Sequence, residues 1–387
     1  MHPGGLVLGV SGGFYVADTG NNSIKAVATD FTVTTFAGKD GTAGSANGTG
    51  SAASFNGPTG MVSDGVGNLY VCDTGNAIIR KITSAGVVTT FAGSSGVRGS
   101  QDGTGSAAQF STPTGIAFDS FGNLYVSDSG NSTIRKITTD GVVTTFAGTA
   151  KSVGDADGVG AAARFNNPTG LVIDSSTNFL YIADTFNDTI RMINTADITT
   201  STPVTNPDGT ITTTTSVATP AGTVKTMAGS PGISGVYDGT GAYALFNLPS
   251  GVATDGSNIF VADTGNNCIR RVTSGGAVTT VAGIAGIAGD RDGTYSSALF
   301  NQPQALVYAS TLIVADTGNS VIRTVTPQSV VSTLALKAPT TDTPGTGGTG
   351  TGSSSGGGGR TEPWFVALLA ISGLVTFLRR RRAASLD

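Results

Sequence analysis

The chain repeats one short pattern six times, and this repetition limits its fold more than any other feature. The stretch GNLYVCDTGN at 67–76 returns as GNLYVSDSGN at 122–131, and related versions occur at four other places. The aspartates of the six copies are spaced by 55, 55, 56, 79 and 53 residues. They are Asp18, Asp73, Asp128, Asp184, Asp263 and Asp316. A period of this length is typical of stacked supersecondary units.

Each repeat reads as four short strands joined by tight turns. In residues 58–93 the apolar runs are about five residues long, and Gly, Asn or Asp bounds each of them. A single four-stranded sheet leaves its faces uncovered, whereas six sheets arranged radially bury them. The sequence therefore predicts an all-β, six-bladed β-propeller of four-stranded antiparallel blades over residues 1–336. A Thr-rich insertion at about 197–221 is expected to be an exposed loop.

The recurring motifs resemble the NHL repeat. They are Pro-x-Gly, Gly-Asn-Leu-Tyr-Val-x-Asp-Thr-Gly-Asn, Ile-Arg-Lys-Ile and Val-Thr-Thr-Phe-Ala-Gly, in that order. The resemblance extends over about residues 3–336 and implies a six-bladed propeller, as in the sensor and recognition domains of that family. It does not specify a ligand, because one fold serves many functions.

The residue counts narrow the possible chemistry. The 387 residues include one His (His2), two Cys (Cys72 and Cys268) and one Glu (Glu362). A multi-histidine zinc site, a Ser-His-Asp triad in the body of the chain and a Cys-x-x-Cys metal clip are therefore excluded. Propellers similar to this one include lyases with His-bound zinc and lactonases with a Glu ligand to calcium. This chain has one His, at its start, and its only Glu lies beside the C-terminal apolar span, so both chemistries lose a ligand that they need. We expect no enzyme and no cofactor, with an all-Asp calcium site in the central channel left open.

Each copy also places a basic residue seven positions after its aspartate. The pairs are Asp18/Lys25, Asp73/Arg80, Asp128/Arg135, Asp184/Arg191, Asp263/Arg270 and Asp316/Arg323. Residues needed in every blade are typical of architecture, so we expect the aspartate to cap its turn through backbone N–H groups, with the arginine pairing to it or to a neighbouring blade. The alternative is a ring of charged binding residues. Recurring aromatic residues are likewise expected in the core between blades rather than at carbohydrates; they are Tyr70, Tyr125, Tyr181, Phe91 and Phe146.

The long connections between repeats are the expected binding region. Alternating strand direction brings them to the same rim as the Asp-Thr-Gly-Asn turns, and loops on a rigid scaffold commonly carry binding residues. The residues that break the repeat there are candidates for recognition, with solvated variation as the alternative. They are Arg98, Lys151, Arg164, Tyr237, Tyr243, Arg291 and Tyr295.

Two of these connections begin like calcium loops. Alternating aspartates precede a glycine at Asp155, Asp157, Asp290 and Asp292. The other repeats lack the first aspartate and no bidentate Glu follows, so a turn without metal is the favoured interpretation. The two cysteines, three blades apart, are expected to be packed and beyond disulfide reach.

The end of the chain carries a separate signal. Residues 337–359 read as a flexible Gly/Thr/Ser linker, and 360–387 as a transmembrane or sorting helix. The segment resembles bacterial sorting signals of the PEP-CTERM and GlyGly-CTERM kinds, which implies a sorting peptidase as a partner; a plain tail anchor is the alternative. The residues that carry this interpretation are Glu362, Pro363, Trp364, Arg379, Arg380, Arg381 and Arg382.

These observations predict that the protein is exported to the cell envelope or surface. Basic residues after the apolar span place the propeller outside. Because Pro3 already matches Pro58 of the repeat, we expect a signal peptide, and further repeats, upstream of the given start. Residues 1–359 carry a net charge of −7, which disfavours nucleic acid as a partner. The leading hypothesis is a scaffold that binds a protein or glycan; a metal-dependent lyase or lactonase-like enzyme and a structural adhesin or matrix spacer are the alternatives.

Overall fold

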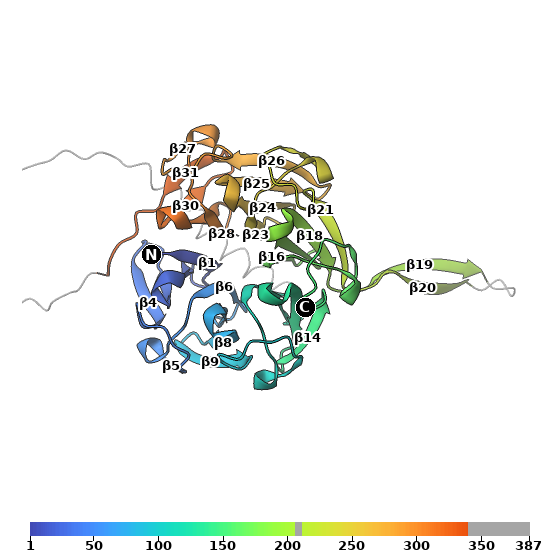
Figure 1. The fold of residues 1–387 in the computed structure, drawn as a ribbon, viewed down its shortest axis with the longest axis horizontal. Coiled ribbons are helices and arrows are strands. Elements are labelled where there is room, and N and C mark those ends of the chain that lie inside the picture. Colours follow the sequence, from blue (N-terminus) through green and yellow to red (C-terminus); the bar gives the residue numbers. More distant parts are fainter. Residues whose placement is uncertain (206–210, 340–387) are drawn as a thin grey trace, which may run out of the picture.

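Each sequence repeat folds into one antiparallel sheet, and the six sheets are arranged as the blades of a propeller (Figure 1). The structure is a computed structural model that describes residues 1–205 and 211–339. Within these residues there is no α-helix, and the helical segments are three-residue 3-10 turns. The expectation of an all-β, six-bladed propeller is confirmed.

Within each blade the strands follow chain order from the centre of the ring outward. The first strands are β1 (Pro3–Leu8), β6 (Pro58–Ser63), β11 (Pro113–Phe118), β16 (Pro168–Asp174), β23 (Pro249–Thr254) and β28 (Pro303–Tyr308). The second strands are β2 (Phe14–Asp18), β7 (Leu69–Asp73), β12 (Leu124–Asp128), β17 (Phe179–Asp184), β24 (Asn258–Asp263) and β29 (Leu312–Asp316). The third strands are β3 (Ser23–Val27), β8 (Ile78–Ile82), β13 (Thr133–Ile137), β18 (Thr189–Asn194), β25 (Cys268–Thr273) and β30 (Val321–Val325). The fourth strands are β4 (Val33–Gly38), β9 (Val87–Ala92), β14 (Val142–Ala147), β21 (Thr223–Ala228), β26 (Ala277–Ala282) and β31 (Val330–Thr333).

Two sets of 3-10 turns connect these strands. Those between the second and third strands are η1 (Thr19–Asn21), η3 (Thr74–Asn76), η5 (Ser129–Asn131), η7 (Thr185–Asn187), η9 (Thr264–Asn266) and η11 (Thr317–Asn319). Those within the long connections are η2 (Gly50–Ala52), η4 (Gly105–Ala107), η6 (Gly160–Ala162), η8 (Gly241–Tyr243) and η10 (Tyr295–Ser297).

Five blades contain a fifth strand, so the prediction of four-stranded blades is wrong for them. The connection that precedes a blade pairs two residues with that blade's fourth strand, as Gly48 pairs with Val88. These strands are β5 (Gly48–Thr49), β10 (Gly103–Thr104), β15 (Gly158–Val159), β22 (Gly239–Thr240) and β27 (Gly293–Thr294). Two residues are too few to show strand periodicity in a sequence. The short strands lie at the periphery of the ring, where β5 and β27 are seen in Figure 1.

Blade 1 keeps four strands, and residues near the end of the described chain cover its outer edge. The N–H of Val33 donates to the carbonyl of Lys337 at 2.8 Å, and the N–H of Lys337 donates to the carbonyl of Phe31 at 2.9 Å. Nearer the centre, the hydroxyl of Thr317 in blade 6 donates to the carbonyl of Pro3 in blade 1 at 2.6 Å. The ring is therefore closed by contacts between its first and last blades.

The hydrophobic core is divided among the interfaces between neighbouring blades. Between blades 2 and 3, for example, Tyr70 and Cys72 pack with Ile116 and Val126. The Tyr70 ring lies 5.1 Å from that of Phe118 in an edge-on arrangement. The recurring strand aromatics belong to these clusters, as expected from strand alternation. Both cysteines are buried and free.

Glycine in the first strands allows the blades to approach one another closely at the centre. A Cβ on Gly60 would lie 2.2 Å from the carbonyl oxygen of Thr114 in the next blade, and one on Gly115 would lie 2.2 Å from that of Thr169. Since these contacts are to backbone, no side chain fits there. The Pro-x-Gly motif thus reflects a packing requirement of the central channel.

The Thr-rich insertion is a hairpin rather than the expected loop. Strands β19 (Ile198–Thr205) and β20 (Ile211–Thr219) pair antiparallel and extend away from blade 4 (Figure 1). Threonine is β-branched and favours strands, but a run of it lacks the apolar alternation that indicates a half-buried strand. Ile198 and Val217, whose side chains the structure describes, are exposed, so burial imposes no apolar alternation on them.

Candidate functional site

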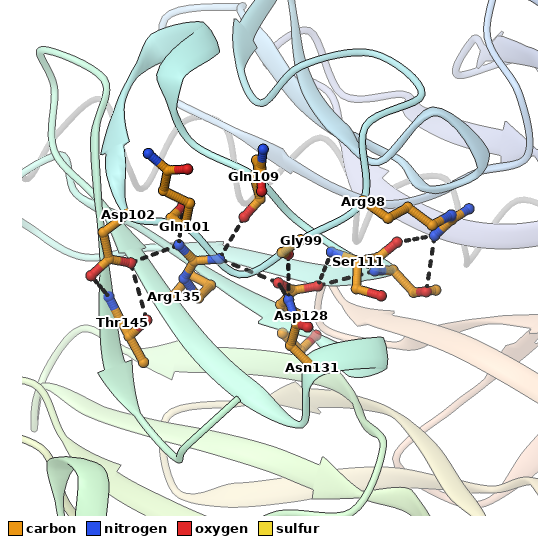
Figure 2. A network of polar contacts seen from close by, with 12 residues as sticks. Arg98, Gly99, Gln101, Asp102, Gln109, Ser111, Asp128, Asn131, Arg135 and Thr145 are labelled. Carbon is orange, nitrogen blue, oxygen red and sulfur yellow. Dashed lines mark hydrogen bonds and ion pairs between the residues drawn. The ribbon is translucent and has the colours of Figure 1, made fainter. Parts of the chain in front are cut away.

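A buried ion pair in blade 3 shows what the repeated Asp and Arg do. Asp128 ends β12 and Arg135 lies on β13, and both side chains are fully buried. One terminal nitrogen of Arg135 donates to Asp128 at 3.3 Å and to the carbonyl of Gln109 at 2.8 Å. The other donates to Asp102 at 2.7 Å and to the carbonyl of Gln101 at 3.1 Å. Figure 2 shows the guanidinium between the two carboxylates, with one on each side.

The aspartate accepts backbone N–H groups of the preceding long connection, whereas from its own turn it accepts only a side-chain amide. The Oδ1 atom of Asp128 accepts the N–H of Ser111 at 2.8 Å, and Oδ2 accepts the side-chain amide of Asn131 at 2.6 Å (Figure 2). No side-chain cap of the turn η5 by Asp128 is formed, which corrects the expected backbone capping. Phe110 lies under the guanidinium of Arg135 at 5.1 Å. Together these residues hold the connection against the blade.

The same arrangement recurs in blades 4, 5 and 6, and in blade 2 the side-chain oxygen of Asn47 takes the place of the second carboxylate. Its buried ion pairs are Asp73–Arg80 (2.9 Å), Asp184–Arg191 (2.7 Å), Asp263–Arg270 (2.8 Å) and Asp316–Arg323 (2.7 Å). Burial raises the pKa of Asp184 and of Asp263 to about 6, although the paired arginine acts in the opposite direction. The repetition in five blades and the complete burial point to a structural role.

Blade 1 departs from this arrangement, and the expected pairing of Asp18 with Lys25 is wrong. The ammonium of Lys25 lies 2.5 Å from Asp40 instead. Asp18 accepts the N–H of His2 at 2.8 Å and the side-chain amide of Asn21 at 2.9 Å. The physical reason is that a lysine offers one compact charge, whereas the planar arginine fork bridges two carboxylates at once.

The hydroxyl that follows each aspartate has a role that sequence analysis missed. It donates to the carbonyl of the proline that opens the next blade. The pairs are Thr19 to Pro58 (2.7 Å), Thr74 to Pro113 (2.7 Å), Ser129 to Pro168, Thr185 to Pro249 (2.8 Å), Thr264 to Pro303 (2.6 Å) and Thr317 to Pro3 (2.6 Å). These six bonds form a ring that joins every blade to its neighbour. The signal was present, because a hydroxyl residue occupies this position in all six repeats.

The long connections and the turns between second and third strands lie on one rim of the propeller. The N–H of Gly75 in η3 donates to the carbonyl of Asn56 in the preceding connection at 2.8 Å. We call this surface the long-loop rim; its connections are residues 39–57, 94–112, 149–167, 230–248 and 284–302.

Three aspartates considered for calcium contact arginine instead. Asp157 accepts a guanidinium N–H of Arg191 at 2.8 Å, while Asp290 and Asp292 both contact Arg323. Asp155 is exposed. Among the described residues no group of three His, Cys, Asp or Glu side chains is arranged to hold a metal ion. A cation at these loops would have to compete with a fixed guanidinium.

The three arginines selected for recognition contact the backbone of the rim. Arg98 donates to the carbonyls of Ser111 and Gly75, the latter at 3.3 Å. Arg164 donates to the carbonyl of Ala163 at 2.7 Å, and Nε of Arg291 donates to that of Ser297 at 2.6 Å. These contacts stabilise the local conformation of the connections.

The remaining recognition candidates are exposed but are not gathered together. Lys151 is exposed at a left-handed backbone position. Tyr237, Tyr243 and Tyr295 are also exposed, and they lie in or beside η8 and η10, close to the peripheral strands β22 and β27. The seven candidates come from four connections, so they are distributed around the long-loop rim and not concentrated in one connection.

A cavity of about 350 Å³ lies at the long-loop end of the central channel. The first strands of all six blades line it, together with Thr185, Leu248 and Thr264. The lining residues are Gly, Thr, Ser, Gln, Ala and larger aliphatic residues, with no Asp, Glu, His or Cys among them. The all-Asp calcium site that was left open for the central channel is therefore not formed by the described residues of this cavity.

Three large apolar side chains are exposed on the long-loop rim around turn η7, and one of them lines this cavity; sequence analysis missed them. Phe186 occupies the glycine position of turn η7 and is 55% exposed. Leu248, 42% exposed, lines the cavity and donates its N–H to Asp188, the residue that follows η7, at 2.7 Å. Ile233, 55% exposed, follows Gly232, whose N–H donates to the carbonyl of Asn187 in the same turn. We call Phe186, Ile233 and Leu248 the mouth patch.

Departures from the repeat at two of these positions were visible in the sequence. Phe186 replaces the glycine of Asp-Thr-Gly-Asn. Leu248 stands before the proline, where other repeats have Gly57, Asn167 and Gln302. Its φ of 49° lies in the left-handed region, which a leucine rarely adopts. The same conformation occurs at Gly57, Asn167 and Gln302, so it belongs to the repeat, and Leu248 is the residue least suited to it.

A protein-family comparison matches segments of the chain that contain the buried Asp–Arg pair. The NHL repeat family model matches residues 110–137 and 246–272. Each matched stretch begins at the phenylalanine under the arginine and ends in a third strand. The chain contains NHL repeats.

Known relatives of this NHL-repeat propeller are much longer. NHL repeat-containing protein 2 of Bos taurus is 28% identical over 210 residues, which cover 51% of this chain and 26% of the relative. Protein SUPPRESSOR OF QUENCHING 1, chloroplastic, of Arabidopsis thaliana is 29% identical over 331 residues, which cover 79% of this chain and 29% of the relative. The chain thus spans between a quarter and a third of the length of these relatives.

A solved structure shares the fold. It is an auxiliary nutrient binding protein from Bacteroides thetaiotaomicron VPI-5482, with a TM-score of 0.57 and 16% identity over 83% of this chain and 66% of that one. At this level of identity the likeness concerns the fold alone.

The C-terminal prediction lies outside the described residues. It concerns 360–387, including Glu362, Pro363, Trp364 and Arg379 to Arg382. In the part of the NHL-repeat chain that the structure describes, no helix is long and apolar enough to cross a membrane. The transmembrane or sorting helix stays a prediction.

Proposed function

We propose that this NHL-repeat propeller is a non-enzymatic scaffold that binds a protein or glycan through its long-loop rim, with the mouth patch as the centre of the contact. The proposal includes presentation at the cell envelope by the C-terminal segment, on the basis of its resemblance to sorting signals. The mouth patch is the observation that carries the proposal, because it is where a repeated scaffold becomes unique.

The patch has the chemistry of a contact surface. Phe186 and Leu248 are exposed at positions where other repeats carry Gly or polar residues, and Ile233 adds a third exposed apolar side chain. Removing a side chain of this size from water is favourable by about 1.5–3 kcal/mol when burial is complete. Clustered exposed apolar side chains with a polar surround are typical of interaction sites.

The cavity behind the patch suits binding better than catalysis. Its wall offers backbone, hydroxyl and aliphatic groups, and several hydroxyls are already engaged between blades. Thr59 donates to the carbonyl of Thr114 at 3.0 Å, and Ser250 donates to that of Gln304 at 2.9 Å. The described lining holds no carboxylate or imidazole to act as a general base or a metal ligand.

The test reverts the patch to the residues of other repeats. The variant Phe186→Gly/Leu248→Asn installs residues that other blades already carry at these positions, so the fold should persist. The matched control is Phe121→Ser, which removes a phenylalanine that is 72% exposed in the turn after β11, on the opposite rim. The full chain and both variants are immobilised and exposed to cell-envelope extract, either untreated, protease-treated or periodate-treated.

We expect the wild type and Phe121→Ser to retain the same partner, and the double variant to lose it. Loss of capture after protease treatment identifies a protein partner, and loss after periodate treatment identifies a glycan. Equal capture by the double variant would refute rim binding and favour the spacer interpretation. Envelope presentation is tested separately, by fractionating cells that produce the chain with and without residues 360–387.

A further inference from the structure

A second cavity lies between blades 5 and 6, near the rim opposite the mouth patch. Its volume is about 180 Å³. Asp255, in the turn after β23, and Ser329, in the turn after β30, are at its edge, and Arg271 on β25 lines it. Both turns belong to the rim that carries only short connections. The volume corresponds to about six water molecules, which is room for one small ring.

Arg271 has no protein partner in this cavity. Its Nε is buried without a hydrogen bond, and the guanidinium forms no ion pair with any described residue. At the corresponding positions of blades 2 and 3, Lys81 and Lys136 lie over tyrosine rings of their own blades at 5.4 and 5.6 Å. Blade 4 has Met192 there. Blade 5 therefore holds a cation whose charge-assisted hydrogen bonds are available to a ligand.

The cavity also has a flat aromatic wall that is specific to this interface. Phe260 of blade 5 and Tyr308 of blade 6 are stacked, with centroids 5.7 Å apart and planes within 5° of each other. Between blades 2 and 3 the corresponding Tyr70 and Phe118 meet edge-on at 83°. A parallel pair presents a continuous apolar surface, which suits the C–H face of a ring.

A carboxylate at the entrance limits which anion can enter. Asp255 accepts the N–H of Ser257 at 2.8 Å and that of Asn258 at 2.6 Å, so its position is fixed by its own turn. It repels a simple anion but accepts hydrogen bonds from hydroxyl groups. The ligand must therefore carry a carboxylate toward Arg271, hydroxyl donors toward Asp255 and an apolar ring face toward the aromatic wall.

We propose that this inter-blade pocket binds a hexuronate, a sugar ring that carries one carboxylate, with Arg271 pairing to the carboxylate and Phe260 and Tyr308 contacting the ring. The proposal goes beyond the proposed function, because the pocket is on the opposite rim and shares no residue with the mouth patch.

The experiment measures binding of D-glucuronate to the full chain by calorimetry, with D-glucose and L-serine as comparison ligands. Two variants use residues that other blades already tolerate at this position, Arg271→Met and Arg271→Lys. Lys136→Met, at the same position of blade 3, is the matched control outside the pocket. Thermal melting checks that every variant is folded.

We expect glucuronate to bind the wild type and Lys136→Met equally, and glucose to bind at least about tenfold more weakly because it lacks the carboxylate. Arg271→Met should weaken glucuronate binding by at least about tenfold, with Arg271→Lys in between. Absence of glucuronate binding at millimolar concentration, or equal affinity in folded Arg271→Met, would overturn the proposal. Stronger binding of serine than of glucuronate would also overturn it, because serine has no ring. Phe186→Gly/Leu248→Asn should leave glucuronate binding unchanged, which separates this test from that of the rim.

Discussion

Replacing Arg135 by Met should destabilise the propeller through the charge left behind on Asp128. Methionine keeps most of the side-chain length, so contact with Phe110 persists while the charge and all four hydrogen bonds are lost. Asp128 is fully buried and would retain only its amide and backbone donors. Breaking a buried pair by removing one partner typically costs about 3–5 kcal/mol. We therefore expect the free energy of unfolding to fall by about that amount.

The exposed partner of the same arginine provides the comparison. The side chain of Asp102 is 48% exposed, so water replaces its contact when the charge is removed. Asp102→Asn should cost no more than about 1 kcal/mol. Arg135→Met/Asp128→Asn removes the buried charge as well, and we expect it to recover most of the stability lost by Arg135→Met alone.

Urea denaturation followed by circular dichroism measures the four free energies. The comparison is valid if the free energy of unfolding falls with urea concentration at the same slope in the wild type and the three variants. A loss in Arg135→Met within about 1 kcal/mol of that in Asp102→Asn would refute the reasoning. If Asp128→Asn does not restore the stability of Arg135→Met, the loss of stability comes mainly from the lost hydrogen bonds to backbone carbonyls and not from the uncompensated charge.

Three further predictions concern packing, closure and pH. Gly60→Ala should destabilise the ring by about 1–3 kcal/mol or prevent folding, because the new methyl group meets the carbonyl of Thr114, and melting temperature measures this. Thr317→Val should cost about 1 kcal/mol in urea denaturation by removing the bond to Pro3 that closes the ring. Because burial raises the pKa of Asp184 from 3.8 to about 6, its contribution to stability is complete below pH 3.8 and is lost as pH rises through 6. The melting temperature of wild type relative to Asp184→Asn should thus be higher at pH 4 than at pH 7.

Each of these predictions has a result that contradicts it. Gly60→Ala with wild-type melting would show that the blades can separate slightly at the centre. Gly275→Ala, where the nearest atom lies 4.0 Å from the added carbon and φ is not positive, controls for the loss of glycine. Thr74→Val removes the equivalent bond to Pro113 between blades 2 and 3 and tests whether it costs as much stability as the bond that closes the ring. A difference between wild type and Asp184→Asn that grows from pH 4 to pH 7 would reverse the sign of the linkage.

The sequence predicted the ring and its repeated parts well because each repeat carries its own turn signals. Gly, Asn and Asp at regular spacing marked the strands, and six copies determined the number of blades. The short fifth strands were missed because each pairs with a strand far along the chain, as Gly48 does with Val88, and a two-residue pairing has no periodicity. The Asp18–Lys25 pairing was wrong because seven-residue spacing places two side chains on adjacent strands without showing which carboxylate a lysine reaches.

The candidate site was predicted in principle but not in its residues. Looking for departures from the repeat on the long-loop rim was a useful approach, yet it selected Arg98 and Tyr243, which come from different blades. Phe186 and Leu248 are 62 positions apart in the sequence. They lie beside the same turn because Leu248 is bound to Asp188 across the junction of blades 4 and 5.

Repetition thus accounts for what a single strand and turn can encode: strand length, turn chemistry, and the hydroxyl, aspartate and arginine that each blade needs. These are local properties, since every copy meets the same surroundings. The three-dimensional ring accounts for what is unique, because a channel mouth or an inter-blade pocket exists only where two different copies meet. The mouth patch and the unpaired Arg271 arise at such junctions, where side chains distant in the chain share one space and their neighbours determine which charges and apolar surfaces remain uncovered.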